Sequence, residues 1–149
     1  MPGPPNYLYE TLFDSEILSL KGLEGFKNSL AFDHNGFTPT KAVCIAKDKN
    51  KIIGIAGAAE SSVNGLWEIG VDVMESYRNS GLGTYLVNRL TEELLVRNIV
   101  PFYSASVTNL GSQMVASRCH YVPVWVDTFG TTLDGSSAYH NIVCKMDFS

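Results

Sequence analysis

The stretch from Leu66 to Arg97 constrains the fold more than any other part of the sequence. It opens with alternating apolar residues, which predict a strand with one buried face: Trp67, Ile69, Val71 and Val73. It closes with leucines at helical spacing, which predict an amphipathic helix: Leu82, Leu86, Leu90 and Leu94. Between them lies a short loop with two glycines, Gly81 and Gly83. The predicted order is strand, glycine loop, helix.

A glycine loop at the start of a helix suits an anion. The glycines let a ligand approach the backbone, and the unpaired N–H groups of the first helical turn, at the positive end of the helix dipole, favour a phosphate. Arg78 adds a positive charge beside them. We therefore predict a pyrophosphate site made by one continuous run of residues: Arg78, Asn79, Ser80, Gly81, Leu82, Gly83 and Thr84.

The spacing excludes two common kinds of phosphate loop. The loop of a nucleoside triphosphatase needs Lys and then Ser or Thr directly after its last glycine, and here Gly83 is followed by Thr84 and Tyr85. A dinucleotide fingerprint needs a third glycine three residues after the second, where this chain has Leu86. What remains is Arg-x-x-Gly-x-Gly before a long helix.

This pattern resembles the signature of the GNAT superfamily of acetyl-CoA-dependent N-acetyltransferases, Arg/Gln-x-x-Gly-x-Gly/Ala between a central strand and a long helix. Arg78, Gly81 and Gly83 match it directly. A second block, from Asn109 to Tyr121, resembles the family's Asn-x-x-Ser/Ala-x-x-Val/Leu-x-x-x-x-Gly-Phe helix. It follows a predicted strand, Pro101 to Ser106.

The resemblance covers residues 42–130 and is closer to an uncharacterised bacterial branch of the family, whose members often carry additional sequence before this region. The residues alone indicate a mixed α/β domain, because a predicted hairpin of residues 42–47 and 52–59 precedes the alternating strands and helices. The family implies a mixed, mostly antiparallel central sheet with splayed parallel strands, flanked by helices. It also implies a bulge in the central strand and a cofactor arm in the gap. We expect one domain, residues 1–149.

The rest of the chain gives weaker signals. Residues 1–9, rich in Pro, are expected to be an extended or poorly ordered lead-in. Asp14 is a candidate helix cap, and the apolar residues after it predict two short helices or one broken helix, because Gly22 and Gly25 interrupt them. Further predictions are loops at residues 32–40 and 131–137 and strands at residues 122–126 and 139–146.

The resemblance implies acetyl-CoA as co-substrate. Backbone groups of Val71 and Val73 would pair with its pantetheine amides as an added strand does, and residues 78–84 would hold its pyrophosphate. Asn109 would contact the pantetheine or acetyl region and also cap its helix. Ser112 would reach the cofactor, although a Ser in the first turn can also be only a local cap.

Glu68 is the candidate general base. It lies out of phase with the apolar face of its strand, near the place where many family members carry a catalytic Glu; alternatively it is a solvated carboxylate or the partner of a buried Arg. Asp72 shares its face if the strand is regular, and could bind a cationic substrate or share the base role. The two lie roughly 13 Å apart along a strand, too far for a hydrolytic carboxylate pair.

The sequence departs from the family at Ala116 and His120. Many members place at the first position a Tyr that protonates the leaving thiolate, which Ala cannot do. Tyr85, Tyr103 and Tyr121 are substitutes, yet each is also explained as an aromatic at the edge of the core. His120 replaces a Gly, and His tolerates a positive φ better than most residues.

Composition limits the remaining choices. Hydrophobic content of 45%, no apolar run of membrane length and no secretory start indicate a cytosolic protein without a membrane partner. A net charge of −4 argues against nucleic acid and favours a cationic acceptor. Cys44, Cys119 and Cys144 are widely spaced, which favours free thiols and no metal site; Cys119 as a nucleophile is the alternative. The strand at residues 139–146 could pair subunits in a homodimer.

We therefore expect an acetyl-CoA-dependent N-acetyltransferase that moves the acetyl group directly to a primary amine of a small molecule or peptide. Two alternatives stay open. One is a non-catalytic acyl-CoA-binding or sensor module, which Ala116 favours. The other is the cofactor-binding half of a longer acetyltransferase. The acceptor would be selected by residues 14–40 and 128–137, which carry no recognisable signature.

Overall fold

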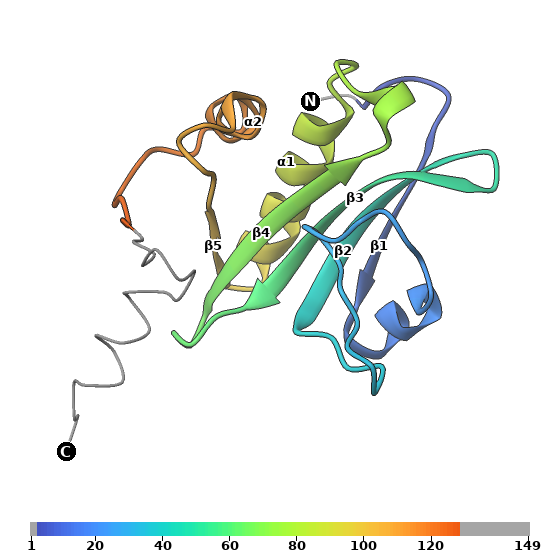
Figure 1. Cartoon of the computed structure of the whole chain (residues 1–149), viewed down its shortest axis with the longest axis horizontal. Coiled ribbons are helices and arrows are strands. Elements are labelled where there is room, and N and C mark those ends of the chain that lie inside the picture. Colours follow the sequence, from blue (N-terminus) through green and yellow to red (C-terminus); the bar gives the residue numbers. More distant parts are fainter. Residues whose placement is uncertain (1–2, 129–149) are drawn as a thin grey trace, which may run out of the picture.

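The computed structural model of the chain describes residues 3–128. Its five strands form one sheet in chain order, antiparallel from β1 to β4, with β5 parallel to β4 (Figure 1). The elements are β1 (Leu8–Phe13), η1 (Asp14–Leu20), β2 (Thr40–Asp48), β3 (Lys51–Glu60), β4 (Leu66–Val73), η2 (Glu75–Tyr77), α1 (Leu82–Val96), β5 (Val100–Tyr103) and α2 (Leu110–Arg118). The mixed, mostly antiparallel sheet is confirmed.

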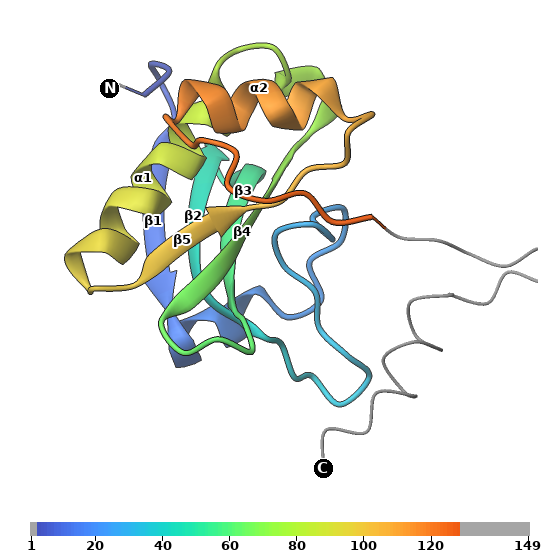
Figure 2. The ribbon, with the colours of Figure 1, turned by 90° about the vertical axis from the view of Figure 1, so that its left-hand side faces the viewer.

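Helix α1 covers one face of the sheet (Figure 2). Its stripe of leucines is buried as the spacing predicts, with at most 1% exposure: Leu82, Leu86, Leu90 and Leu94. Gly54 in β3 lets the helix approach closely, because a Cβ there would lie 2.9 Å from Cδ1 of Leu86. The helix ends at Val96, and Asn98 follows with a φ of 59°, a left-handed conformation typical of the end of a helix.

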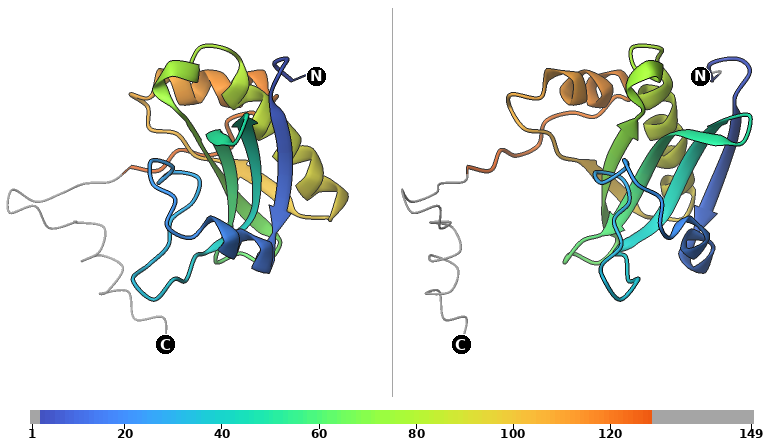
Figure 3. Two further views of the ribbon diagram at one scale, coloured as in Figure 1. Left: turned by 90° about the vertical axis from the view of Figure 1, so that its right-hand side faces the viewer. Right: turned by 45° about the vertical axis from the view of Figure 1, so that its right-hand side comes forward.

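An irregular segment, residues 14–39, covers the opposite face (Figure 3). The prediction of two short helices or one broken helix is only partly right, because the segment contains a single 3-10 helix, η1. Asp14 is the first residue of that helix and Phe13 is its N-cap. Gly22 and Gly25 adopt φ values of 90° and 92°, which no helix accommodates, so the chain turns away there.

Strand β1 was not predicted. Leu8 and Tyr9, placed in the lead-in by the sequence, are its first two residues, and it pairs with β2 from Leu8–Lys47 to Phe13–Ala42. The strand lies at the edge of the sheet, and most of its side chains are exposed or half-buried. The alternation that marks a strand in sequence is therefore weak here.

The chain after α1 differs from the prediction in two places. Strand β5 ends at Tyr103, because Ser106 turns the loop: its hydroxyl accepts from Thr108 N (3.3 Å) and its carbonyl from Gln113 Nε2 (3.0 Å). The strand predicted at residues 122–126 is wrong. These residues are irregular and their valines are 71–79% exposed, and Pro123 cannot donate to a ladder. The predicted loop at 131–137 and strand at 139–146 lie outside the described residues.

Candidate active site

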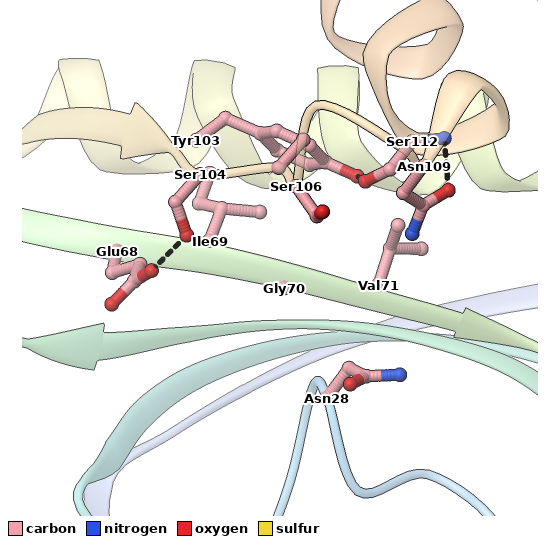
Figure 4. A pocket seen from close by; sticks show the side chains of 11 residues that line it. Asn28, Glu68, Ile69, Gly70, Val71, Tyr103, Ser104, Ser106, Asn109 and Ser112 are labelled. Carbon is pink, nitrogen blue, oxygen red and sulfur yellow. Dashed lines mark hydrogen bonds between the residues drawn. The ribbon is translucent and has the colours of Figure 1, made fainter. Parts of the chain in front are cut away.

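Strands β4 and β5 part halfway along β4. They pair from Leu66–Val100 to Ile69–Tyr103, after which β5 ends and β4 continues to Val73. A cleft of about 330 Å³ lies at this point (Figure 4). It is lined by Asn28, Glu68, Ile69, Gly70, Val71, Tyr103, Ser104, Ala105, Ser106, Asn109 and Ser112. The splayed parallel strands implied by the GNAT resemblance are therefore present.

The backbone of β4 turns polar groups toward the gap. At the start of β4 the carbonyl of Gly65 accepts a hydrogen bond from β5 (2.8 Å), and at its end Met74 N donates to β3 (2.9 Å). Because successive residues alternate, the N–H and C=O groups of Val71 and Val73 point to the β5 side, beyond the end of β5. The Val73 carbonyl accepts from Arg78 Nε (3.0 Å). Both valines thus have the orientation expected of a strand that pairs with a ligand.

Glu68 and Asp72 share the face opposite α1. The bulge implied by the family is absent from β4, because each of its residues pairs with one residue of β3 without interruption, from Trp67–Glu60 to Val73–Gly54. A regular strand keeps both carboxylates on one side. Only Glu68 lines the cleft, where the Ser104 hydroxyl donates to its Oε1 (Figure 4).

Asp72 is occupied by other contacts. Its Oδ2 accepts from Asn28 N, Ser29 N and Ser29 Oγ, each at 2.8 Å, and its Oδ1 accepts from Asn28 Nδ2 at 2.6 Å. The carboxylate therefore fixes residues 28–29 on the sheet. Its predicted share in the base role stays a prediction, and the geometry gives it a structural task.

The predicted pyrophosphate loop, residues 78–84, lies at the carboxyl end of β4. Gly81 is the N-cap of α1 with a φ of 81°, and no side chain among the described residues caps the helix. The first intrahelical hydrogen bond is accepted by the Gly81 carbonyl from Tyr85 N (3.0 Å). The N–H groups of residues 82–84 are therefore free to bind an anion. The side chains of Leu82 and Thr84 are buried, so these residues offer only main-chain groups.

Hydrogen bonds hold the loop before the helix in shape. Asn79 adopts a φ of 60°, and the Ser80 hydroxyl donates to the Tyr77 carbonyl (2.6 Å). The Tyr77 hydroxyl in turn donates to Asp48 (2.8 Å), the last residue of β2. The loop is thus hydrogen-bonded to the hairpin, so less conformational entropy is lost when it binds a ligand.

The second sequence block supplies the other wall of the cleft. Asn109 is the N-cap of α2, since its side chain accepts from Ser112 N (3.0 Å), as predicted. The Ser112 hydroxyl is 2.7 Å from that of Tyr103. Burial raises the pKa of Tyr103 above its usual value, and the hydrogen bond with Ser112 offsets part of that rise. Tyr121 bonds instead to Thr91 (2.6 Å) and does not line the cleft.

The residues after α2 have structural roles. His120 adopts a φ of 64°, so the position does need a conformation that glycine usually provides. Cys119 is 6% exposed, its thiol donates to the Thr84 carbonyl (3.3 Å), and burial raises its pKa to about 11. A protonated, buried thiol is a poor nucleophile, which disfavours the covalent alternative.

Sequence reasoning missed three polar side chains that line the cleft: Asn28, Ser104 and Ser106. Ser104 has a weak signal, since it lies two residues after Phe102, the partner of Glu68 in β5. Asn28 has none, because the sequence predicts a helix for its segment and nothing in that pattern indicates a contact with the cleft. The cleft therefore brings together Glu68, Val71, Asn109 and Ser112, whose predicted roles stay predictions, while Asp72 is hydrogen-bonded to Asn28.

Within residues 3–128 no helix has the length and apolar character to cross a membrane. The same residues hold no group of three or more His, Cys, Asp or Glu side chains arranged to bind a metal ion. The cytosolic location, the lack of a nucleic-acid partner and the oligomeric state stay predictions.

Comparison with known proteins agrees with this geometry. Residues 8–121 match the Acetyltransferase (GNAT) family. An aminoglycoside acetyltransferase from an uncultured soil metagenomic sample, meta-AAC0020 in complex with sisomicin, is 15% identical, with a TM-score of 0.62 over 86% of this chain and 97% of that chain. The ribosomal-protein-S18-alanine N-acetyltransferase of Escherichia coli is 16% identical, with a TM-score of 0.59 over 88% of each chain.

A third similar structure contains the coenzyme. Aminoglycoside N-acetyltransferase AAC(6')-Iy in complex with CoA is 22% identical, with a TM-score of 0.52 over 62% of this chain and 66% of that chain. At these identities the structures show a common fold. No curated protein matches the chain. Because the family match spans most of the sequence, and the fold and the cleft agree with it, this chain belongs to the GNAT family of acetyltransferases.

Proposed function

We propose that this enzyme transfers an acetyl group from acetyl-CoA directly to a primary amine of a small molecule or peptide. The observation that carries the proposal is the cleft between β4 and β5, because it lies between an uncapped helix N-terminus that suits a pyrophosphate and a carboxylate that suits a base. Enzymes of similar fold act on both acceptor classes, because one is an aminoglycoside acetyltransferase and another is a ribosomal-protein-S18-alanine N-acetyltransferase.

The residues around the cleft fit acetyl-CoA. The N–H groups of residues 82–84 and the Arg78 guanidinium suit its pyrophosphate, and the backbone groups of Val71 and Val73 suit its amides. Gly83 lies against the strand, since a Cβ there would make an ordinary contact with Val73 Cγ2 at 3.5 Å. When bound, acetyl-CoA supplies the reactive thioester, with Asn109 and Ser112 near its acetyl end.

Glu68 is the proposed general base. Its carboxylate takes the proton of the attacking amine, directly or through a water molecule. The Ser104 hydroxyl holds Oε1, which leaves Oε2 to face the acceptor. Positioning the amine against the thioester supplies a further part of the acceleration. Asp72 contributes by fixing Asn28 at the acceptor side of the cleft.

A pair of hydroxyls takes the place of the tyrosine that is absent at Ala116. Because burial raises the pKa of Tyr103, its hydroxyl is protonated at neutral pH and can donate to Ser112 Oγ. The Ser112 hydroxyl then directs its own proton into the cleft, toward the departing sulfur. Transfer is direct, because the Cys119 thiol is buried and protonated.

Calorimetric titration with acetyl-CoA tests the coenzyme site. Arg78→Ala should raise the dissociation constant of acetyl-CoA about five- to tenfold, because it removes one charge-assisted contact. Arg97→Ala is the matched control, because Arg97 lies beyond the other end of α1 and pairs with Glu93 (2.7 Å); it should leave affinity unchanged. A protein that does not bind acetyl-CoA at millimolar concentration would refute the proposal.

Release of free thiol tests the transfer itself. Sisomicin and a peptide with N-terminal alanine represent the two acceptor classes, and we expect turnover with a primary amine of at least one of them. If acetyl-CoA binds and no amine stimulates thiol release, the chain is a binding module rather than a catalyst.

A further inference from the structure

The backbone of residues 28–29 lies directly on the sheet, on the face opposite α1. A Cβ at Gly57 would overlap the carbonyl oxygen of Ser29, and a Cβ at Gly70 would overlap that of Asn28. Only glycine permits this approach. The distance between this segment and the strands is therefore fixed by backbone packing. Asn28, which belongs to the segment, lines the cleft (Figure 4).

The orientation of the Asn28 amide is set by Asp72. Ionised Asp72 can only accept hydrogen bonds, so the Asn28 amide must turn its nitrogen toward that carboxylate, and Nδ2 donates to Oδ1 at 2.6 Å. The backbone N–H of Asn28 donates to the other oxygen at 2.8 Å. Two contacts to one carboxylate leave the side chain little freedom. In Figure 4 the amide oxygen of Asn28 lies on the side of Glu68, and it is the group left to face a ligand.

The cleft thus offers two acceptors of different charge. Glu68 carries a carboxylate, and Asn28 presents a neutral carbonyl oxygen. A neutral acceptor suits a neutral donor such as a hydroxyl, whereas a second ammonium would need a second carboxylate. Asp72, the carboxylate that contacts Asn28, already accepts four hydrogen bonds.

We propose that Asn28 determines acceptor specificity: its Oδ1 accepts a hydrogen bond from a hydroxyl next to the reacting amine, so the preferred substrates are hydroxylated amines. Asp72 is a positioning residue that acts through Asn28. This inference rests on the proposed function, in which Glu68 faces the reacting nitrogen. The serines at 104 and 106 give the same end of the cleft a polar lining, which agrees with a hydroxylated ligand.

The test compares two amines that differ by one hydroxyl, 2-aminocyclohexanol and cyclohexylamine. Their dissociation constants are measured by NMR titration of the full chain, with and without CoA. The wild type should bind 2-aminocyclohexanol more tightly. Asn28→Ala should weaken that binding about fivefold, as expected for one hydrogen bond, and leave cyclohexylamine unchanged.

Ser29→Ala is the matched control. It also removes one hydrogen bond to Asp72 (2.8 Å), but its side chain is buried and does not line the cleft. Ser29→Ala should keep the preference for the hydroxylated amine, and its melting temperature shows whether the two variants are equally destabilised. Three results would each overturn the assignment. They are an equal loss of the preference for the hydroxylated amine in both variants, an unchanged preference in Asn28→Ala, and no preference in the wild type. Failure of the coenzyme site would appear separately, as a missing CoA titration, while the amine titrations of the free protein still report on Asn28.

Discussion

The two faces of β4 are stabilised in different ways. On one face its apolar side chains pack against α1, whose leucines are fully buried. On the other face the backbone of residues 28–29 lies on Gly57 and Gly70 and is held by hydrogen bonds to Asp72. The first face depends on buried apolar area, and the second on polar contacts and on the absence of side chains. We call the α1 face the coenzyme side and the face covered by residues 28–29 the acceptor side. Single substitutions should therefore affect the two sides separately.

Glu68→Gln should give the largest effect. Loss of a general base lowers kcat about 100-fold or more, while the dissociation constant of acetyl-CoA should stay the same, because Glu68 lies on the face opposite the helix. Arg78→Ala should do the reverse. Steady-state kinetics and calorimetry measure the two quantities. If Glu68→Gln weakened acetyl-CoA binding as much as catalysis, the two faces would not be functionally separate.

Gly57→Ala should destabilise the acceptor side by displacing Ser29. The added methyl would overlap a backbone carbonyl, which cannot move as a side-chain end can, so we expect a loss of about 3 kcal/mol in the free energy of unfolding. Gly111→Ala in α2 is the control, because its nearest neighbour would be Asn109 Oδ1 at 3.8 Å. Urea denaturation compares them. Equal stability of the two variants would mean that residues 28–29 do not pack on the sheet in solution.

Asp72→Asn should have a smaller effect on stability, about 1–2 kcal/mol, because neutral hydrogen bonds replace charge-assisted ones. The new carboxamide would also let the Asn28 amide rotate and present its nitrogen to the cleft, where the substrate hydroxyl would have to accept instead of donate, so the preference for the hydroxylated amine should weaken. Glu10→Gln is the control, since it breaks an exposed ion pair with Lys47 (2.7 Å) worth at most about 1 kcal/mol. A change in acetyl-CoA affinity in Asp72→Asn would contradict the separation of the faces.

The glycine loop and the helix after it could be predicted from the sequence because their pattern is local. Residues 78–84 follow β4 directly and lead into α1, so the glycines, the arginine and the helical period lie in one continuous pattern. The cap at Asn109 is local in the same sense, since its partner is Ser112. Short-range rules of backbone conformation suffice for such a site.

The acceptor side could not be predicted, because its contacts are distant in sequence. Asn28 and Asp72 are 44 residues apart, and nothing in the irregular segment around Asn28 indicates its partner. Gly57 permits close packing, but a glycine does not reveal which backbone approaches it. The incorrect strand at residues 122–126 has a related cause: its valines suit a strand, yet β propensity depends on pairing, and no strand within residues 3–128 pairs with it.

A sensitivity to alkaline pH should also be confined to the α1 face. Burial raises the pKa of both Cys44 and Cys119 to about 11, and both lie in the core beneath α1. An exposed thiol titrates near 8.5, so between about pH 8.5 and 11 the unfolded chain has lost protons that the folded chain retains, and the free energy of unfolding falls as pH rises. Cys44→Ala should make this fall shallower in urea titrations at pH 8 and 10.

Hydrogen exchange at the two pH values can locate the effect. Corrected for its intrinsic pH dependence, protection of α1 amides should decrease at pH 10 more than that of residues 28–29, because the apolar core on the other face contains no thiol among the described residues. Tyr121→Phe is the comparison and should reduce the effect less than Cys44→Ala, because a tyrosine of the unfolded chain titrates near 10 and begins to lose its proton only at the upper pH, while Tyr121 in the folded protein has a pKa of about 12. An equal decrease on both faces would mean that the domain opens as one unit at high pH, and that the two faces differ in chemistry but not in stability.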